Sequence, residues 1–388
     1  MAGIYVHIPF CRKKCKYCDF VSFPDLSSED LYFVALVSEI RRLGPLMKGR
    51  VFDTVFIGGG TPTVLKPGKL STLMNELNKA FAIAEGAEIT CEANPESATV
   101  EKLKELFGAG VNRLSIGLQS ADELVLKKAG RIHSYKDFLD AYGAARRIGF
   151  SNINADVMHG LPGQTAASYL ATLRMLTELG PEHISSYELI LEEGTPLFRE
   201  VEEGATELPD RDLTADMQDA GMEFLAEHGY LRYEISNFAL PGFECRHNIN
   251  YWNNGEYLGI GLNAHSALRI SGDWVRFRNT EDLGEYVEKL GEDKLPVAET
   301  QTISREEEIF ESIMVGLRKV KGISRADFAA RFGRDPVELF SPVVTQLELD
   351  GMMIVEGDGM FLTKRGLDFQ NEVLLRFMDQ LPWETEEE

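Results

Sequence analysis

The sequence predicts an α/β fold: a partial barrel built from six β-strand and α-helix units, followed by a small C-terminal α+β domain. Three observations support this expectation. Short β-rich runs alternate with longer helical patterns through the first half of the chain. Polar or glycine-rich motifs follow most of these runs, and the alternation stops near residue 236.

Six runs are expected as strands of a parallel sheet, at residues 4–8, 54–57, 88–92, 113–117, 152–157 and 183–189. Helical periodicity is expected between them, for example over 30–43 and 169–179, with stop signals at 44–45 and 180–181 where glycine precedes proline. Six consecutive units fit either an open doubly wound sheet or a complete or partial barrel of the TIM type. Both architectures gather functional residues at the carboxyl ends of the strands.

The rest of the chain divides into three further parts. After the barrel (1–236), residues 237–300 are expected as strands and loops packed beside it, residues 301–380 as a C-terminal domain, and residues 381–388 as an acidic tail. The C-terminal pattern predicts helices at 306–317, 325–332 and 337–350 and short strands at 354–355 and 361–362, which resembles a winged helix. Residues 301–388 carry ten basic and 18 acidic side chains, which favours a structural or protein-binding role over DNA binding.

Composition limits the functional classes. The 388 residues carry 40 basic and 62 acidic side chains, a net charge of −22, which opposes binding to nucleic acid. No secretory signal or membrane-spanning run is expected, and five cysteines with three of them clustered fit a reducing, cytoplasmic location. Cys91 and Cys245 are expected as unpaired thiols.

Three cysteines, Cys11, Cys15 and Cys18, form a C-x3-C-x2-C motif directly after the first run. A 4Fe-4S cluster takes a thiolate on each of its four irons. Three thiols therefore leave one iron open, as in catalytic rather than structural metal sites. The alternative is a zinc site in which His7 is the fourth ligand.

Other polar motifs follow the later runs. They are 58–62 after the second, 92–95 after the third, Gln119 and Ser120 after the fourth, and Asp156 at the end of the fifth. The run 58–62 (GGGTP) departs from the phosphate-binding pattern of P-loops. Its glycines allow the backbone to approach a ligand closely, and its free backbone groups suit an ammonium or a carboxylate.

The cysteine motif together with the glycine-rich strand end resembles the radical S-adenosylmethionine (SAM) proteins. That resemblance implies a partial barrel of six βα units. It also implies a 4Fe-4S cluster whose open iron binds the amine and carboxylate of SAM and passes an electron to its sulfonium, which releases a 5′-deoxyadenosyl radical. The residues 58–62 would receive the methionine amino group.

A closer resemblance covers nearly the whole chain. The stretches 5–11, 58–62, 92–95, 117–120, 130–131 and 160–165, together with Asp156, resemble the oxygen-independent coproporphyrinogen dehydrogenase (HemN-like) family. That resemblance implies a SAM pocket formed by Tyr5, Tyr17, Gly59, Gly60, Thr61, Glu92, Gln119, Arg131 and Asp156. Glu92 and Asp156 suit the ammonium and ribose hydroxyls, and Arg131 suits the carboxylate.

Three features depart from the dehydrogenase and resemble a haem-chaperone branch of the same family. Phe20 stands where the enzyme has a further cysteine, the chain begins four residues before Tyr5, and residues 247–252 form an H-N-x-x-Y-W motif. The resemblance implies haem contact through His247, Asn248, Tyr251 and Trp252. Cys245 and His265 are alternative iron ligands, and the competing interpretation is an aromatic cap with His247 hydrogen-bonded in the core.

The leading hypothesis is a haem chaperone that binds haem and transfers it to apo-haemoproteins, including respiratory ones, while holding a 4Fe-4S cluster and SAM and drawing on an electron donor. We expect no coproporphyrinogen turnover. The alternative is an oxygen-independent coproporphyrinogen III oxidase, which would explain why the SAM-binding residues are intact. A zinc-bearing interaction protein is a third, weaker hypothesis.

Overall fold

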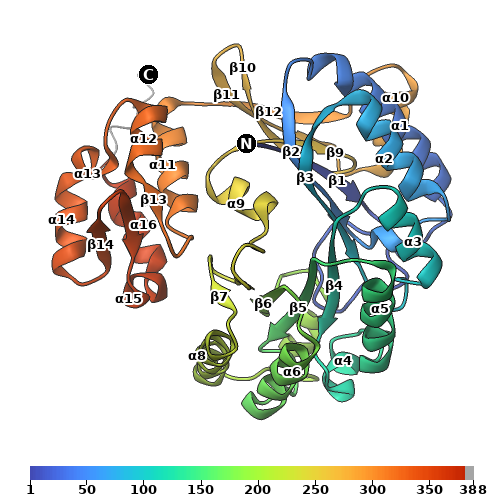
Figure 1. Cartoon of the computed structure of the whole chain (residues 1–388), viewed down its shortest axis with the longest axis horizontal. Helices are drawn as coiled ribbons and strands as arrows, with labels where there is room; N and C mark the ends of the chain where they lie inside the picture. Colours follow the sequence, from blue (N-terminus) through green and yellow to red (C-terminus); the bar gives the residue numbers. More distant parts are fainter. Residues whose placement is uncertain (381–388) are drawn as a thin grey trace.

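The computed structural model describes residues 1–380, so the predicted acidic tail at 381–388 lies outside the described residues. A curved sheet of twelve strands runs through the molecule, and a smaller domain with a three-stranded sheet lies beside its open side (Figure 1). Each part has a separate hydrophobic core. No helix among residues 1–380 is long and apolar enough to cross a membrane.

Six parallel strands form the centre of the large sheet, and each pairs with its neighbour in the sequence. This consecutive order is that of a barrel, whereas a doubly wound sheet reverses direction after its first strands. The predicted partial barrel is therefore confirmed. The strands are β1 (Ala2–Ile8), β2 (Val51–Gly59), β3 (Ala82–Ala93), β4 (Arg113–Gln119), β5 (Ile153–His159) and β6 (His183–Glu188).

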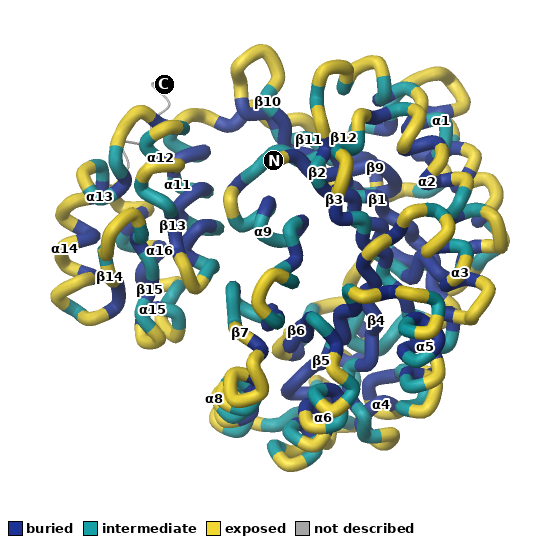
Figure 2. Tube along the Cα trace, in the orientation of Figure 1, coloured by how far each residue is buried: buried dark blue, intermediate teal, exposed yellow. Residues whose placement is uncertain are grey.

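Helices cover the convex face of the barrel, with exposed residues outward and buried ones toward the strands (Figure 2). Several begin at side-chain caps, for example the capping boxes at Ser134 and Thr165. The helices of this half are α1 (Glu29–Leu46), α2 (Lys69–Ala80), α3 (Val100–Gly108), α4 (Glu123–Lys128), α5 (Tyr135–Ile148), α6 (Ala166–Leu179), α7 (Pro196–Glu202) and α8 (Arg211–Glu227), with a 3-10 turn, η1 (Pro62–Val64).

The stop expected at Gly44 and Pro45 is wrong, because α1 continues to Leu46 with Pro45 inside its last turn. Pro45 costs little there, since few backbone bonds remain to be lost near a helix end. Gly44 instead allows close packing on α2, because a Cβ on it would lie 3.1 Å from the Ala80 carbonyl oxygen. The other stop is confirmed, and Gly180 caps α6 in the left-handed conformation.

The segment 237–300 does not lie beside the barrel as expected but extends its sheet at both edges. β9 pairs in parallel with β1, while β8 pairs with β6 at the other edge. Two helices also interrupt the segment. Its elements are β8 (Asn237–Ala239), α9 (Arg246–Trp252), β9 (Glu256–Ile260), β10 (His265–Ile270), β11 (Asp273–Asn279), α10 (Leu283–Gly291) and β12 (Val297–Ile303), preceded by β7 (Leu231–Arg232).

The C-terminal domain has the predicted helices and hairpin, with one correction. The helix expected over 337–350 is broken at Phe340, because Pro342 lacks the N–H that would continue it and starts a new helix. The elements are α11 (Arg305–Gly316), β13 (Ile323–Ser324), α12 (Arg325–Phe332), α13 (Pro336–Leu339), α14 (Ser341–Leu349), β14 (Met353–Glu356), β15 (Gly359–Leu362), α15 (Lys364–Asp368) and α16 (Gln370–Met378).

Polar contacts attach this domain to the barrel. Arg276 of β11 donates to both carboxylate oxygens of Glu311 at 2.9 Å, and the buried Asn254 amide donates to Ser312 at 3.1 Å. The guanidinium of Arg318 lies over the Trp252 ring, 5.5 Å from its centroid. The two hydrophobic cores do not merge, so the domain is held mainly by charged and aromatic contacts.

A buried carboxyl group joins the outer helices to the extended edge of the sheet. Glu39 of α1 accepts hydrogen bonds from the Tyr286 hydroxyl (2.5 Å), the Asn279 amide (2.6 Å) and the Gly261 backbone (2.9 Å). Burial outweighs these bonds and raises the pKa of Glu39 to about 7.

This raised pKa predicts a pH-dependent stability. Between its ordinary value of 4.5 and about 7, Glu39 stays protonated in the folded chain and ionises in the unfolded chain. Rising pH therefore lowers the free energy of unfolding, by about 3 kcal/mol in total at roughly 1.4 kcal/mol per pKa unit. Glu39→Gln should remove this slope in urea unfolding measured from about pH 5 to 8.

The matched control is Glu288→Gln, at an exposed position of α10, which should unfold in parallel with the wild type at every pH. Parallel curves for Glu39→Gln and the wild type would contradict the assignment of a raised pKa to Glu39.

Candidate functional site

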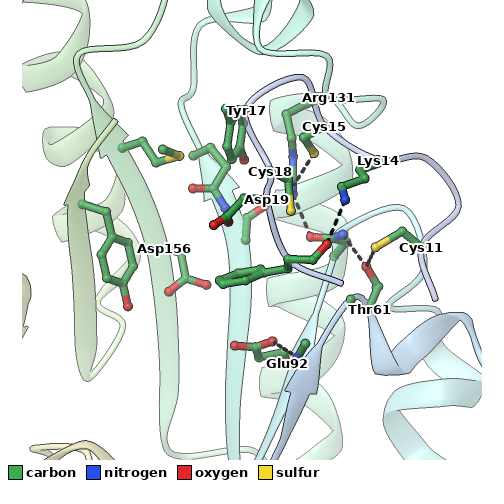
Figure 3. Close-up of a pocket in the computed structure, with 18 of the residues that line it drawn as sticks. Cys11, Lys14, Cys15, Tyr17, Cys18, Asp19, Thr61, Glu92, Arg131 and Asp156 are labelled. Carbon is green, nitrogen blue, oxygen red and sulfur yellow. Dashed lines mark hydrogen bonds between the residues drawn. The ribbon is translucent and has the colours of Figure 1, made fainter. Parts of the chain in front are cut away.

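A cavity of about 420 Å³ opens at the carboxyl ends of the central strands. Figure 3 shows the cysteine loop on one side of it and carboxylates from the sheet on the other. Nearly all predicted cluster and SAM residues meet here although they come from six separate segments. Those lining the cavity are Cys11, Cys15, Tyr17, Cys18, Gly59, Gly60, Thr61, Glu92, Gln119, Arg131 and Asp156.

The cysteine loop is fixed above the sheet by backbone hydrogen bonds. The Cys11 amide donates to the Phe23 carbonyl at 3.0 Å, and the Lys16 amide donates to the Ala129 carbonyl at 3.1 Å. All three thiols are free, as are Cys91 and Cys245. The predicted unpaired state of these last two is therefore confirmed, and the loop presents its sulfurs to the cavity.

Burial and a neighbouring cation act in opposite directions on the thiols. Burial raises the pKa of Cys18 to about 11 and also raises that of Cys11. The Arg131 guanidinium lies 3.5 Å from the Cys15 sulfur. At Cys11 the charge of Arg131 opposes the effect of burial on the pKa and favours thiolate, the form that binds iron. The donor set therefore fits a cluster held by three sulfurs.

The zinc alternative does not fit the position of His7. One ring nitrogen of His7 is 3.0 Å from the Tyr5 hydroxyl and the other is 2.8 Å from the Val21 carbonyl oxygen. Within residues 1–380, no three histidine, cysteine or acidic side chains converge as ligands of a single ion, which a tetrahedral zinc site requires. Thiols of a cubane cluster instead bind separate irons.

The glycine-rich end of β2 allows the backbone to pass close beside the cysteine loop. Gly59 has φ of 103°, which favours glycine. A Cβ on Gly60 would lie 2.6 Å from the Phe10 carbonyl oxygen. The Thr61 hydroxyl, 3.4 Å from the Cys11 sulfur, accepts a hydrogen bond from Asn94 at 2.8 Å.

Two buried carboxyl groups form the floor of the cavity. Burial and the nearby Asp156 raise the pKa of Glu92 to about 8, although the Gly59 amide donates to it at 3.1 Å. Burial also raises the pKa of Asp156, which accepts hydrogen bonds from Ser115 (3.1 Å) and Asn154 (2.7 Å). A bound cation or hydroxyl would offset the cost of desolvating such groups in their charged form.

Most of the hydrogen-bond donors of Arg131 already have partners within the protein, so few remain for the carboxylate that the resemblance implied. One of its terminal nitrogens donates to Asn94 at 2.7 Å and to the Gly117 carbonyl at 2.8 Å. The other terminal nitrogen contacts the Cys15 sulfur, which leaves it one donor for a carboxylate. Arg131 therefore supports both the cysteine loop and the predicted carboxylate position.

One predicted SAM residue, Tyr5, is not among the residues that line the cavity, and its ring stacks on Phe56. The cavity is also lined by Ser115, Met158 and Tyr187, which were not predicted. Strand alternation could have identified two of them, because Ser115 shares a face with Gln119, and Met158 with Asp156.

In the H-N-x-x-Y-W motif His247 is buried, whereas Asn248, Tyr251 and Trp252 are partly exposed. α9 sits within the curve of the sheet and contacts β1, β2 and β9 (Figure 1). His247 is 1% exposed, and its ring nitrogens lie 2.8 Å from the Thr54 hydroxyl and 3.0 Å from the Tyr251 hydroxyl. This matches the competing interpretation of a core histidine, and neither nitrogen is free for iron.

The other proposed haem ligands differ in access. Cys245 is fully buried, 3.4 Å from a Glu88 oxygen, and the same carboxylate accepts from the backbone amides of Arg246 and His247 at the start of α9. His265, at the start of β10, is exposed.

Comparisons with known proteins find two families represented in the chain. The model of the radical SAM superfamily matches residues 5–176, and that of the HemN C-terminal domain matches residues 303–369. A coproporphyrinogen III oxidase, HemN of Escherichia coli, has a similar solved structure with a TM-score of 0.83 and 26% identity, covering 97% of this chain and 89% of that one.

Curated relatives are similar along their whole length. The heme chaperone HemW of Bacillus subtilis is 38% identical over 98% of this chain and 100% of its own. HemW of Escherichia coli is 34% identical over 97% of this chain and 98% of its own. The chain therefore belongs to the HemW family of radical SAM proteins.

Proposed function

We propose that this protein is a haem chaperone that binds haem, transfers it to apo-haemoproteins and holds a 4Fe-4S cluster and SAM at the barrel cavity. The observation that carries this proposal is the full-length similarity to HemW proteins together with a three-thiol cavity. Apo-haemoproteins, including respiratory ones, and an electron donor are the proposed partners. The proposed location is the cytoplasm.

The chain's own residues have distinct parts in this proposal. Cys11, Cys15 and Cys18 would hold three irons, and when bound the cluster would supply one open iron and a reducing electron for SAM. Glu92 and the backbone at Gly59 and Gly60 would receive the SAM amino group. The donor set on this wall of the cavity includes no fourth cysteine, since Phe20 lines it instead.

The remaining polar groups would orient the rest of SAM. Asp156, held by Ser115 and Asn154, presents carboxylate oxygens to ribose hydroxyls. Arg131 supplies its remaining donor to the methionine carboxylate. Tyr17 and Met158 give the cavity an apolar side against which an adenosyl group packs.

A second candidate function is oxygen-independent coproporphyrinogen III oxidation. The specific observation in its favour is the structural similarity to HemN, which extends over nearly the whole chain, combined with an intact set of SAM-binding residues. This function is the second candidate because the sequence identity to HemW proteins is higher than the identity to HemN.

Substitution of Glu92 tests the proposed place of the SAM amino group. Glu92→Gln should weaken SAM binding to the cluster-loaded protein about ten- to a hundredfold, as expected for loss of a charged hydrogen-bond acceptor worth about 1.5 to 3 kcal/mol. Anaerobic calorimetry measures the affinity. Because the pKa of Glu92 in the wild type is about 8, the ionised fraction of this side chain rises with pH. The affinity of the wild-type protein for SAM should therefore increase from about pH 6.5 to 8. The affinity of Glu92→Gln should not change over this range.

The control is Glu178→Gln, at an exposed position of α6, which should bind SAM as the wild type does. Unchanged affinity in Glu92→Gln would contradict the placement of the amino group.

A paired assay of haem binding and coproporphyrinogen turnover separates the two candidate functions. One anaerobically reconstituted sample is titrated with haem and also incubated with coproporphyrinogen III, SAM and a reductant. We expect a Soret band from bound haem and no protoporphyrinogen IX by chromatography. Conversion of one or more equivalents of coproporphyrinogen III per protein would favour the oxidase instead.

A further inference from the structure

Asp156, the carboxyl group proposed to bind the SAM ribose, is held by two side chains. Its oxygens accept hydrogen bonds from the Asn154 amide at 2.7 Å and from the Ser115 hydroxyl at 3.1 Å. The same amide also donates to the Ser115 oxygen at 2.7 Å. Asn154 and Asp156 alternate on β5 and so share one face of the strand. The direction in which Asp156 points into the cavity (Figure 3) therefore depends on how the Asn154 amide is oriented.

The orientation of this amide is set by side chains of the neighbouring strand β6. The Asn154 oxygen lies 2.6 Å from Nδ1 of His183 and accepts a hydrogen bond from the Ser185 hydroxyl at 3.1 Å. An amide oxygen only accepts hydrogen bonds, so Nδ1 of His183 carries the proton of this contact. A half-turn of the amide would place its oxygen against the Asp156 oxygens, which are acceptors too. By donating to the Asn154 oxygen, His183 opposes that half-turn.

His183 is held in turn by a tyrosine. Its Nε2 lies 2.8 Å from the Tyr233 hydroxyl, and the oxygen of that hydroxyl accepts a hydrogen bond from the Cys245 backbone amide at 3.2 Å. In a neutral ring whose proton is on Nδ1, Nε2 has a free lone pair, so the Tyr233 hydroxyl donates to it. The donors of this series therefore all point the same way, from the start of α9 to Asp156.

The surroundings of His183 keep its ring neutral. Its side chain is 0% exposed, and burial together with the charge of Arg113 lowers its pKa. The donor and acceptor roles of the two ring nitrogens are therefore fixed by their partners. Neither His183 nor Tyr233 lines the cavity, so any effect of these residues on a ligand there passes through other side chains.

We propose that His183 is a positioning residue for SAM, which orients Asn154 and thereby directs Asp156 at the ribose hydroxyls. Tyr233 has the same role one step further from the cavity. This inference rests on the proposed place of SAM. Because the series begins at Cys245, directly before α9, it also connects the cavity to the helix that carries the H-N-x-x-Y-W motif.

The test is calorimetric titration of the anaerobic, cluster-loaded protein with SAM. His183→Leu removes the donor to Asn154 and should raise the Kd about three- to tenfold, as for the loss of one net hydrogen bond. Tyr233→Phe should raise the Kd about two- to threefold, because His183 keeps its contact with Asn154. His183→Asn should restore most of the affinity, because its amide nitrogen takes the place of Nδ1.

A double-mutant cycle with Asp156→Ala distinguishes positioning from a general loss of structure. Because His183 acts through Asp156, His183→Leu should cause no further loss of SAM affinity in the Asp156→Ala protein. Methionine has the amino and carboxylate groups of SAM but no ribose, so its Kd should be the same in every variant. Where His183→Leu folds poorly, Tyr233→Phe replaces it in the cycle, because it removes only a hydroxyl.

The matched controls are His159→Leu and Tyr230→Phe, which should bind SAM as the wild type does. The His159 ring is buried and makes no hydrogen bond within residues 1–380, and the Tyr230 hydroxyl donates to the Pro181 carbonyl at 2.7 Å.

Three results would overturn the inference: a wild-type SAM Kd in both His183→Leu and Tyr233→Phe, additive losses in the cycle, or an equal loss of methionine binding. A wild-type protein that binds no SAM, or an Asp156→Ala protein that binds it normally, would instead overturn the proposed place of SAM itself.

Discussion

The site depends on one close approach between two backbone segments. The Gly60 amide donates to the Ile8 carbonyl at 2.8 Å, and the Thr61 amide donates to the Phe10 carbonyl at 2.7 Å. These bonds extend the pairing of β1 and β2 beyond the strands and into the cysteine loop. A side chain at Gly60 would collide with Phe10, so the glycines that line the cofactor cavity also fix the height of the thiols above the sheet.

Local sequence patterns predicted most of the fold. All six central strands and the clustering of polar groups at their ends follow from periodicity and from motifs at run ends, since parallel strands bring their carboxyl ends to one rim. What failed depended on distant contacts. Gly44 was mistaken for a stop because its partner, Ala80, lies on another helix, and the parallel pairing of β9 with β1 joins segments about 250 residues apart in sequence.

The candidate site also combines residues that local patterns predicted with residues whose role depends on distant contacts. Cysteines and glycines have narrow chemical roles, so their spacing was informative before any contact was known. The aromatic motif at 247–252 was ambiguous because histidine, tyrosine and tryptophan serve packing and ligand binding equally well. The residues around the motif decide between packing and ligand binding. They are Thr54, Phe56 and Glu88, which come from strands far away in the sequence.

The desolvated carboxyl groups of the cavity bear on what the chain binds besides haem. A carrier that only held haem would have no evident need for buried, electrostatically unfavourable carboxyl groups such as Glu92, whose pKa is raised to about 8. Those groups belong to a cavity at the carboxyl ends of the central strands, where the three thiols of the cysteine loop also lie. The raised pKa of Glu92 therefore supports the proposal that the chain holds SAM as well as haem.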